Sequence, residues 1–419
     1  MEEKTYLCVD LKSFFASVEC VERGLDPFST NLVVADIERT NGTVCLAITP
    51  AMKALGIRNR CRMFEIPSDV EYIVAKPRMK LYMQYSATIY GIYLKYVSAE
   101  DIHIYSIDEC FLDVTQYLKL YKMTAKELAK TIIDDVTKTT GVCATVGIGT
   151  NLFLTKVALD ITAKHTPDFM GYLDEKEFKR TIWHHKPITD IWNIGQGIAK
   201  RLEKFGAYDL CDVAHLDKKL LYKEFGVNAE FLIDHAWGRE PCTIAQIHEY
   251  KTKSNSLSNG QILFEDYSFE DALLVLCEMV DNLDLELVDK SLVTNSISLH
   301  IVYSKDVIKS TGGSMKIEEY TNSSKKLVKA FEEFYRKTTN PYYPVRKIYI
   351  GFNNVVDEAF QTISMFTDVE DDEKELKMQQ AILEIKHKYG KNAILRGTSL
   401  EEKSTTKKRN MLVGGHNGE

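Results

Sequence analysis

Short apolar runs near the start of the chain alternate with segments of helical spacing. Residues 5–9 form a short, mostly apolar run that is typical of a buried strand, and Asp10 follows it directly. In residues 11–19 the apolar positions recur at helical spacing. The pattern therefore predicts a core strand that leads into a helix, with a carboxylate at the junction.

A second acidic position lies within a predicted β-hairpin. Polar and apolar residues alternate over 101–105, and residues 110–114 are again β-prone. Ser106 to Glu109 fall at the tip, so Asp108 and Glu109 are adjacent acids there. Two such acids repel each other and lose hydration unless a cation lies between them. An exposed acidic turn is the alternative interpretation.

The two acidic positions converge if the first strand lies beside the hairpin. Asp10, Asp108 and Glu109 would then present three carboxylates at one edge of a sheet. Oxygen donors of this kind suit Mg²⁺, which proteins hold with one or two carboxylates and substrate phosphates. Two such ions can activate a nucleophilic oxygen and stabilise a leaving one.

The first 170 residues predict an α+β domain. Pro50 is placed to begin a helix that Gly56 ends. Thr124, with Glu127 three residues later, forms a capping-box pattern at the start of another helix. The predicted strands are 31–36, 43–48 and 142–148, and the predicted helices are 51–55, 76–96, 124–139 and 151–163. Strands with helices packed on one face give the α+β class.

The second half of the chain changes from helices to an alternation of strands and helices. Residues 171–240 are mostly helical with short loops, and residues 241–253 are polar and resemble a linker. An acidic stretch after residue 356 leads into a helix over 375–389. The elements predicted between them are strands at 254–264, 294–303 and 345–353, helices at 268–288 and 323–338, and a turn at 311–313.

Composition limits the class of protein only loosely. The chain has 419 residues, enough for about two to four domains. Nine cysteines lie scattered without CxxC pairs, which indicates reduced thiols. No apolar run reaches the length of a membrane span and no signal peptide is visible, so we expect a cytoplasmic protein without a membrane partner. The net charge of −7 argues mildly against nucleic-acid binding, but acids gather at 368–375 and leave room for a local basic face.

The residues around the two acidic positions resemble the signature motifs of the Y family of translesion DNA polymerases. These motifs are residues 9–19 (VDLKSFFASVE) and 105–109 (YSIDE), and they stand in the family's order at roughly its separation. The family includes bacterial polymerase IV and the catalytic subunit of polymerase V. The resemblance extends from residue 1 to about residue 355.

The resemblance implies an α+β right-hand polymerase with a palm, small fingers, a helical thumb and an α/β little-finger domain. The implied activity is template-directed, metal-dependent nucleotidyl transfer in lesion bypass, with primer–template DNA and deoxynucleoside triphosphates as substrates. The implied boundaries are palm 1–18 and 79–170, fingers 19–78, thumb 171–240, linker 241–253, little finger 254–355 and C-terminal tail 356–419.

The resemblance also implies roles for individual residues at the active site. Asp10, Asp108 and Glu109 would be catalytic and would hold two Mg²⁺ ions, with Leu11 also at the metal site. Phe15 would be the steric gate against the sugar 2′-oxygen. The family's fingers tyrosine is not matched, because Thr49 and Pro50 occupy its neighbourhood. The residues implied in nucleotide binding are Ser13, Phe14, Phe15, Thr49, Lys53 and Lys156.

Two further contacts are implied outside the active site. A helix-hairpin-helix at 191–202 would bring the amides of its glycines to a DNA phosphate, since a helix N-terminus favours anions. A short peptide before the acidic stretch is similar to the sliding-clamp-binding peptides of bacterial polymerases. The DNA-binding residues are then Gly195, Gly197, Lys251, Lys253 and Arg346, and the clamp-binding residues are Gln361, Ser364, Met365 and Phe366.

Two alternatives remain at this point. One is a catalytically inactive homologue that only binds DNA and a clamp, and the presence of all three acids counts against it. The other is a nucleotidyl cyclase, whose catalytic fold also pairs aspartates on a palm-like sheet. The helix-hairpin-helix motif and the additional C-terminal domain count against the cyclase.

Overall fold

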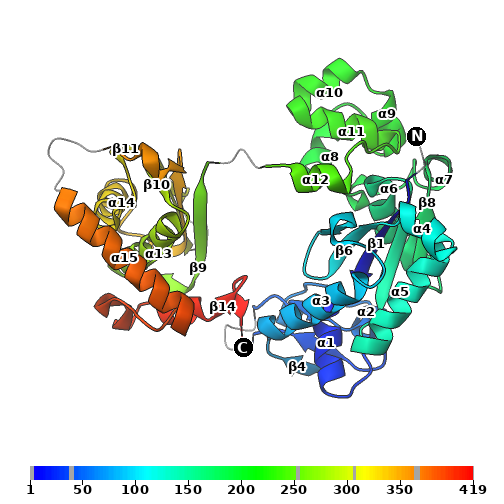
Figure 1. The fold of residues 1–419 in the computed structure, drawn as a ribbon, viewed down its shortest axis with the longest axis horizontal. Helices are drawn as coiled ribbons and strands as arrows, with labels where there is room; N and C mark the ends of the chain where they lie inside the picture. The colour runs from blue at the N-terminus through cyan, green and yellow to red at the C-terminus, as the bar shows by residue number, and fades with distance from the viewer. Residues whose placement is uncertain (1–3, 37–41, 252–254, 305–307, 363–368, 419) are drawn as a thin grey trace. The chain divides into compact units, whose positions relative to one another are not determined.

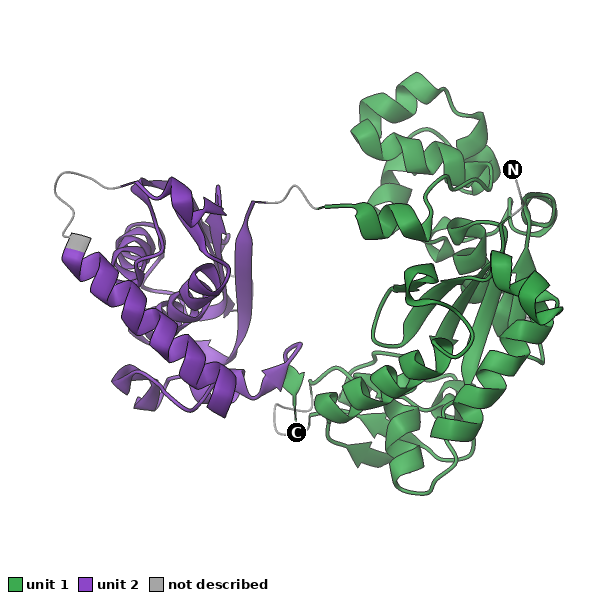
Figure 2. Cartoon of the chain, in the orientation of Figure 1, with its two compact units in different colours: residues 1–251, 416–419 green, residues 252–415 purple. Residues whose placement is uncertain are grey.

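The chain folds into two compact units (Figure 2). The computed structural model describes residues 4–36, 42–251, 255–304, 308–362 and 369–418. Unit 1 comprises Met1–Lys251 and His416–Glu419, and unit 2 comprises Thr252–Gly415. Each unit combines helices with a sheet of mainly antiparallel strands, which agrees with the predicted α+β class. None of the described helices is long and apolar enough to cross a membrane.

A five-stranded sheet forms the centre of unit 1, in the order β5-β6-β1-β7-β8. Its first strand pairs antiparallel with both β6 and β7, and β5 and β6 form the predicted hairpin. One strand of this sheet, β8, was not predicted, because its four residues include a glycine and show no clear alternation. The strands are β1 (Tyr6–Leu11), β5 (Ile102–Ile104), β6 (Glu109–Asp113), β7 (Ala144–Gly149) and β8 (Met170–Leu173).

Helices cover both faces of this sheet (Figure 1). On one face lie α3 (Met79–Tyr93) and α5 (Ala125–Thr140), and α5 begins with the predicted capping box between Thr124 and Glu127. On the other face, α6 (Leu152–Val157) continues into a π-helical turn, Ala158–Thr162. This segment lies directly on β7, because a Cβ atom at Gly147 would stand 2.1 Å from the Thr155 carbonyl oxygen. The glycine is therefore required by the close approach of helix and strand.

The segment expected to form the fingers is a small layer beside this sheet. A three-stranded sheet, β3-β2-β4, packs with two short helices around a core of its own. The strand expected at 43–48 is confined to Ala47–Ile48, and only an isolated bridge joins Val44 to Arg62. The elements are α1 (Phe14–Glu22), β2 (Leu32–Val34), β3 (Ala47–Ile48), α2 (Pro50–Ala54) and β4 (Ile73–Ala75).

A helical region follows β8, as the sequence predicts. The residues expected to be a linker differ from that expectation, because α12 (Ile244–Glu249) lies within them and has its own capping box. Ile244 is buried in the same cluster as Tyr6 and Phe111, so α12 packs on the central sheet. The other helices of unit 1 are α4 (Thr115–Tyr121), α7 (Glu175–Thr181), α8 (Gln196–Glu203), α9 (Leu210–His215), α10 (Lys218–Phe225) and α11 (Ala229–Ala236).

Unit 2 is built on a second antiparallel sheet, in the order β11-β10-β12-β9. Two helices pack on this sheet, and the core lies between helices and strands. The turn expected at 311–313 is wrong, since these residues begin the long strand β11 and Gly312 pairs with His300. Gly312 has φ +119°, which L side chains rarely adopt. The elements are β9 (Leu257–Tyr267), α13 (Phe269–Asp289), β10 (Leu292–Tyr303), β11 (Thr311–Thr321), α14 (Ser324–Thr338) and β12 (Val345–Asn353).

The C-terminal tail folds onto the helices of unit 2. Its main element, α15, is longer than the predicted helix and packs along α13 (Figure 1). Gln379 is buried against α13, where it donates to Asp284, and Glu375 is buried at the start of α14, where it accepts from the Ser323 hydroxyl. The remaining elements are β13 (Val356–Asp357), α15 (Val369–Tyr389), α16 (Thr406–Asn410), β14 (Leu412–Val413) and β15 (His416–Asn417).

Candidate active site

The three predicted acids lie together at one edge of the central sheet of unit 1. Asp10 in β1 is the direct antiparallel partner of Glu109 in β6. The backbone N–H of Leu11 donates to the carbonyl oxygen of Asp108 over 3.0 Å, which joins the hairpin tip to the end of β1. The convergence expected from the sequence is therefore present in the fold.

The Glu109 carboxylate is already engaged within the protein. The Lys156 Nζ atom lies 2.8 Å from one of its oxygens and 3.0 Å from the other. The Cys8 thiol also donates to Glu109, over 3.1 Å. Glu109 is only 8 % exposed and Lys156 only 7 % exposed, so the pair is buried.

Lys156 lies between two carboxylates. Its Nζ atom is also 3.1 Å from an oxygen of Asp160, one helical turn further along the chain. Burial alone would lower the pKa of Lys156, but the carboxylates of Asp160 and Glu109 raise that pKa above its usual value. The expected role of Lys156 at the triphosphate stays a prediction, and in this structure its ammonium group is paired with two acids of the chain.

Asp10 and Asp108 are in a different position. The Asp108 carboxylate accepts a hydrogen bond of 2.6 Å from the Ser106 hydroxyl. Burial, and then the nearby charges of Asp108 and Glu109, raise the pKa of Asp10 to about 7. Among the described groups in direct contact, one lysine faces these three acids, so acidic groups are in excess there.

A divalent cation is the natural complement of this excess. Within the described residues, no three side chains of His, Cys, Asp or Glu are arranged ready to hold a metal ion. The reason lies in Glu109, whose oxygens face Lys156 and Cys8. The donor set still fits Mg²⁺ in its chemistry, because carboxylate oxygens are the ligands that Mg²⁺ prefers.

Two lysines, Lys12 and Lys53, lie within electrostatic range of Asp10, and a third, Lys164, lies within range of Lys53. Burial lowers the pKa of Lys53, while the nearby Asp10 raises that pKa and Lys164 lowers it further. Burial also lowers the pKa of Lys12, and Lys53 adds to this effect. The Lys12 Nζ atom lies 3.2 Å from the centre of the Phe169 ring. Lys53 was predicted, whereas Lys12 and Lys164 were not, because the approach of Lys12 to Asp10 and of Lys164 to Lys53 depends on tertiary structure.

The residues at the start of α1 follow Asp10 closely along the chain and include one with an unusual backbone conformation. Ser13 adopts a left-handed conformation (φ 48°, ψ 43°), and its buried hydroxyl has no hydrogen-bond partner among the described residues. Phe14 is buried, whereas Phe15 is half-buried, and its ring centre lies 4.6 Å from that of Tyr82. A strained backbone and an unpaired hydroxyl at one position indicate a site prepared for a ligand.

The hydroxyl of Thr49 does not reach the site. Thr49 is fully buried, and its hydroxyl oxygen accepts a hydrogen bond of 3.2 Å from the Leu32 N–H. The expectation that Thr49 binds nucleotide stays a prediction, and its hydroxyl group is occupied within the protein. Its hydroxyl instead connects the N-terminus of α2 to β2.

The residues expected to bind DNA have varied surroundings. Gly195 is the N-cap of α8, and both Gly195 and Gly197 are exposed. Lys251 is exposed, whereas Lys253 lies outside the described residues. Arg346 lies 3.8 Å from Asp266, so its charge is partly balanced within unit 2.

The expected clamp-binding peptide is described only in its first residues. Gln361 is exposed and donates its backbone N–H to the Glu358 carbonyl oxygen. Ser364, Met365 and Phe366 lie outside the described residues. Their role therefore stays a prediction.

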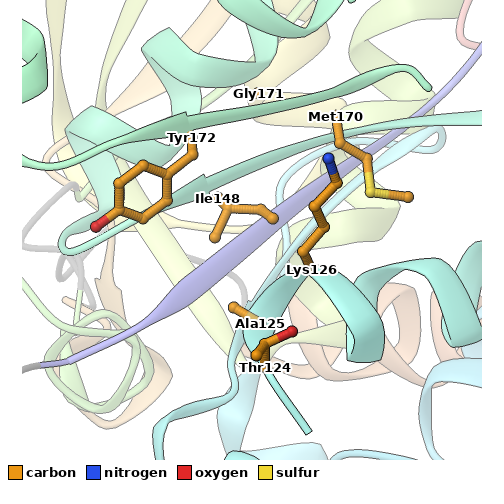
Figure 3. Close-up of a pocket in the computed structure, with 7 residues that line it drawn as sticks. All are labelled: Thr124, Ala125, Lys126, Ile148, Met170, Gly171 and Tyr172. Carbon is orange, nitrogen blue, oxygen red and sulfur yellow. The ribbon is translucent and has the colours of Figure 1, made fainter. Parts of the chain in front are cut away.

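A separate cavity opens on the opposite face of the central sheet (Figure 3). Its volume is about 310 Å³, and its walls come from β7, β8 and the start of α5. It contains no residue predicted to be functional. The residues that line it are Thr124, Ala125, Lys126, Ile148, Met170, Gly171 and Tyr172.

Comparison with known proteins finds a matching family and relatives that span nearly the whole chain. The chain matches the impB/mucB/samB family over residues 9–160 and the C-terminal domain of that family over residues 254–365. It is 33% identical to the putative UV-damage repair protein UvrX of Bacillus subtilis, over 99% of this chain and 97% of that protein. It is 28% identical to DNA polymerase IV 2 of the same organism, over 99% of each chain.

A solved structure also matches the fold of this chain. The Y-family DNA polymerase chimera Dbh-Dpo4(243-245)-Dbh matches with a TM-score of 0.64 and 21% sequence identity. The match covers 84% of this chain and 99% of that chain. The predicted right-hand polymerase fold is thereby confirmed.

Proposed function

The chain belongs to the impB/mucB/samB family of Y-family DNA polymerases, and on this basis we propose that it extends a DNA primer along a template and copies past damaged bases. The observation that carries the proposal is the pairing of Asp10 with Glu109 next to Asp108, at a sheet edge where acidic groups are in excess. The names of the relatives, a UV-damage repair protein and a polymerase IV, support the same role.

Asp10, Asp108 and Glu109, with the carbonyl oxygen of Leu11, would hold the two Mg²⁺ ions. When bound, such ions lower the pKa of the primer 3′-hydroxyl and neutralise the departing pyrophosphate. The protein's own contribution is to gather the acids on paired strands and to keep them partly desolvated, where charge interactions are strong.

The incoming triphosphate would bind to the lysines beside the acids. Lys53 lies within electrostatic range of both Asp10 and Lys164, and Lys12 is held nearby on the Phe169 ring. The amides and the unpaired hydroxyl at Ser13 add neutral donors for the phosphate oxygens. Phe15, fixed by its contact with Tyr82, would pack under the deoxyribose and exclude a 2′-hydroxyl.

DNA would bind through backbone amides and scattered cations. The exposed N-terminus of α8, with Gly195 and Gly197, offers N–H groups to a phosphate. Lys251 and Lys253 add positive charge after α12. Arg346 is a weaker candidate than expected, because Asp266 already lies beside it.

A sliding clamp would tether the enzyme through the peptide from Gln361 to Phe366. Tethering raises the local concentration of the polymerase at the primer end without new DNA contacts. Changing Met365 and Phe366 together to alanine should remove stimulation by the clamp in a primer-extension assay. Extension without the clamp should stay the same, and equal stimulation of both proteins would contradict the assignment.

A primer-extension assay with Mg²⁺ tests the proposed function directly. We expect template-directed addition of one nucleotide on an intact template and on a template with a damaged base. Asp108→Asn, which removes one acidic charge at nearly constant shape, should abolish both reactions. One alternative function is that of a catalytically inactive homologue that binds DNA. The pairing of Glu109 with Lys156 favours this alternative. Tight DNA binding without extension by the unmodified protein would support that alternative.

A further inference from the structure

One ammonium group in the active site has two acidic partners. The Lys156 Nζ atom contacts Glu109 at 2.8 Å and Asp160 at 3.1 Å. Glu109 belongs to the acidic cluster, whereas Asp160 lies on the π-helical turn that follows α6. The lysine thus lies between Glu109, which belongs to the proposed cation site, and Asp160, which does not.

The local fold explains this placement. Gly147 lets α6 lie against β7, which buries Lys156 over the sheet face that carries Cys8, Asp10 and Glu109. The π-helical turn then places Asp160 in contact with the same ammonium group. π-helical turns are rare in proteins, and those that occur often lie at functional sites.

Glu109 has little freedom while Lys156 holds it. Both of its oxygens lie within 3.0 Å of the ammonium group, and the Cys8 thiol contacts one of them. A cation that draws Glu109 toward Asp10 and Asp108 has to break this pair. A buried lysine left without a partner would oppose that change by several kcal/mol. Asp160 removes much of this penalty, because it still pairs with the lysine after Glu109 has left.

We propose that Lys156 is a movable counter-charge, which holds Glu109 in the cation-free enzyme and is retained by Asp160 when a divalent cation recruits Glu109. Asp160 is then a positioning residue of the active site. The inference rests on the proposed function, because it concerns the cation site assigned there. Under this inference, the cation and Lys156 compete for the carboxylate of Glu109.

Competition predicts opposite effects for the two partners of Glu109. Asp160→Asn removes the alternative acceptor, so Lys156 should hold Glu109 more firmly and cation affinity should fall. Lys156→Met removes the competitor at similar length, so cation affinity should rise. The changed charges acting independently would give additive effects on cation affinity, whereas competition predicts that Asp160→Asn has little effect once Lys156 is replaced by Met.

Binding of Mn²⁺ to the full chain, without DNA or nucleotide, is the measurement. Electron paramagnetic resonance of free Mn²⁺ gives Kd independently of catalysis. We expect Kd to increase by about fivefold or more in Asp160→Asn and to decrease by a similar factor in Lys156→Met. The matched control is the exposed Lys130–Asp134 pair on α5, which has the same spacing along a helix. Asp134→Asn should leave Kd unchanged.

The outcomes separate this inference from the proposed function. If the parent protein binds no Mn²⁺, or if Asp108→Ala binds as tightly as the parent, the cation site is wrong and the inference is overturned with it. If Asp108→Ala loses binding but Asp160→Asn and Lys156→Met both match the parent, or both weaken binding, only the inference is overturned. Circular dichroism melting without cation identifies a variant that fails to fold, and Lys156→Gln then replaces Lys156→Met.

Discussion

Two groups of buried or partly buried acidic side chains among the described residues differ in the partners that the protein gives them. In unit 1, Asp10, Asp108 and Glu109 gather at a sheet edge around one lysine. In unit 2, Glu278, Asp281 and Asp284 follow one another along α13 beneath the C-terminal tail. We call the first group the palm acids and the second group the α13 acids.

The tail supplies a partner for each of the α13 acids, although the second carboxyl oxygen of Asp284 has none among the described residues. Glu278 accepts hydrogen bonds from the Ser404 hydroxyl and from the Thr405 N–H. Arg396 lies 2.9 Å from Asp281, and Gln379 donates to Asp284 over 2.6 Å. All these donors come from residues 379–405. The tail therefore brings hydrogen-bond and ion-pair donors to the α13 acids when it packs on α13.

Among the described residues, the palm acids have fewer partners of this kind. Lys156 engages Glu109, while Asp10 keeps a pKa raised to about 7 by burial and by its acidic neighbours. A buried charge that the protein leaves unbalanced weakens the fold unless something external compensates it. The comparison indicates that the α13 acids serve structure and that the palm acids serve a cationic ligand.

The largest expected effect comes from removing a palm acid. Asp10→Ala should lower the rate of single-turnover primer extension by roughly 10³-fold or more, since charge stabilisation is a large share of catalysis. Stability in the absence of metal should stay equal or increase, because like charges are relieved. Urea unfolding and extension rates, with Asp134→Ala as the control, check both statements. A large loss of stability would place Asp10 with the structural acids instead.

The second effect concerns the α13 acids and should be confined to stability. Gln379→Ala leaves the buried carboxylate of Asp284 without its donor, which should lower the free energy of unfolding by about 2–3 kcal/mol. Gln380, its exposed neighbour on α15, is the matched control. Equal urea midpoints for Gln379→Ala and Gln380→Ala would contradict the structural role of the tail.

The smallest effect is a change in pH dependence. Burial raises the pKa of Asp284 well above its usual value. The folded state therefore keeps a proton that the unfolded chain releases above about pH 4, so stability falls as pH rises from there through the folded pKa. Asp284→Asn should remove this contribution, which amounts to at most about 1.4 kcal/mol per pH unit. Urea unfolding from pH 5 to pH 8 should therefore show a flatter profile for the variant, whereas parallel profiles would disagree with the assignment.

The predicted part of the fold is the part with strong local signals. The apolar run before Asp10 and the alternation around the hairpin predicted the strand and the hairpin, and the fold meets the condition that they lie side by side, with Asp10 paired to Glu109. The capping box at Thr124 likewise marked the start of α5. In each case a local pattern and the tertiary contact agree.

The missed part depends on contacts between distant residues. Gly312 suggested a turn, but pairing with His300 makes it part of a strand. The helix at Ile244 forms where a distant cluster around Tyr6 buries that side chain. Lys156 was matched to the triphosphate from its place on a helix, and only the folded chain reveals its pairing with Glu109.

The central claim is that the palm acids bind a divalent cation. Urea unfolding measured with and without Mg²⁺ tests this claim most directly. All three tryptophans, Trp183, Trp192 and Trp237, lie in unit 1, so their fluorescence reports the unfolding of the unit that carries the site. A ligand that binds only the folded state raises its stability in a saturable way. We predict that Mg²⁺ raises the urea midpoint of the parent protein beyond a NaCl control of equal ionic strength, and that this gain disappears in Asp10→Ala/Asp108→Ala. An unchanged midpoint in the parent, or an equal gain in the double variant, would contradict the claim.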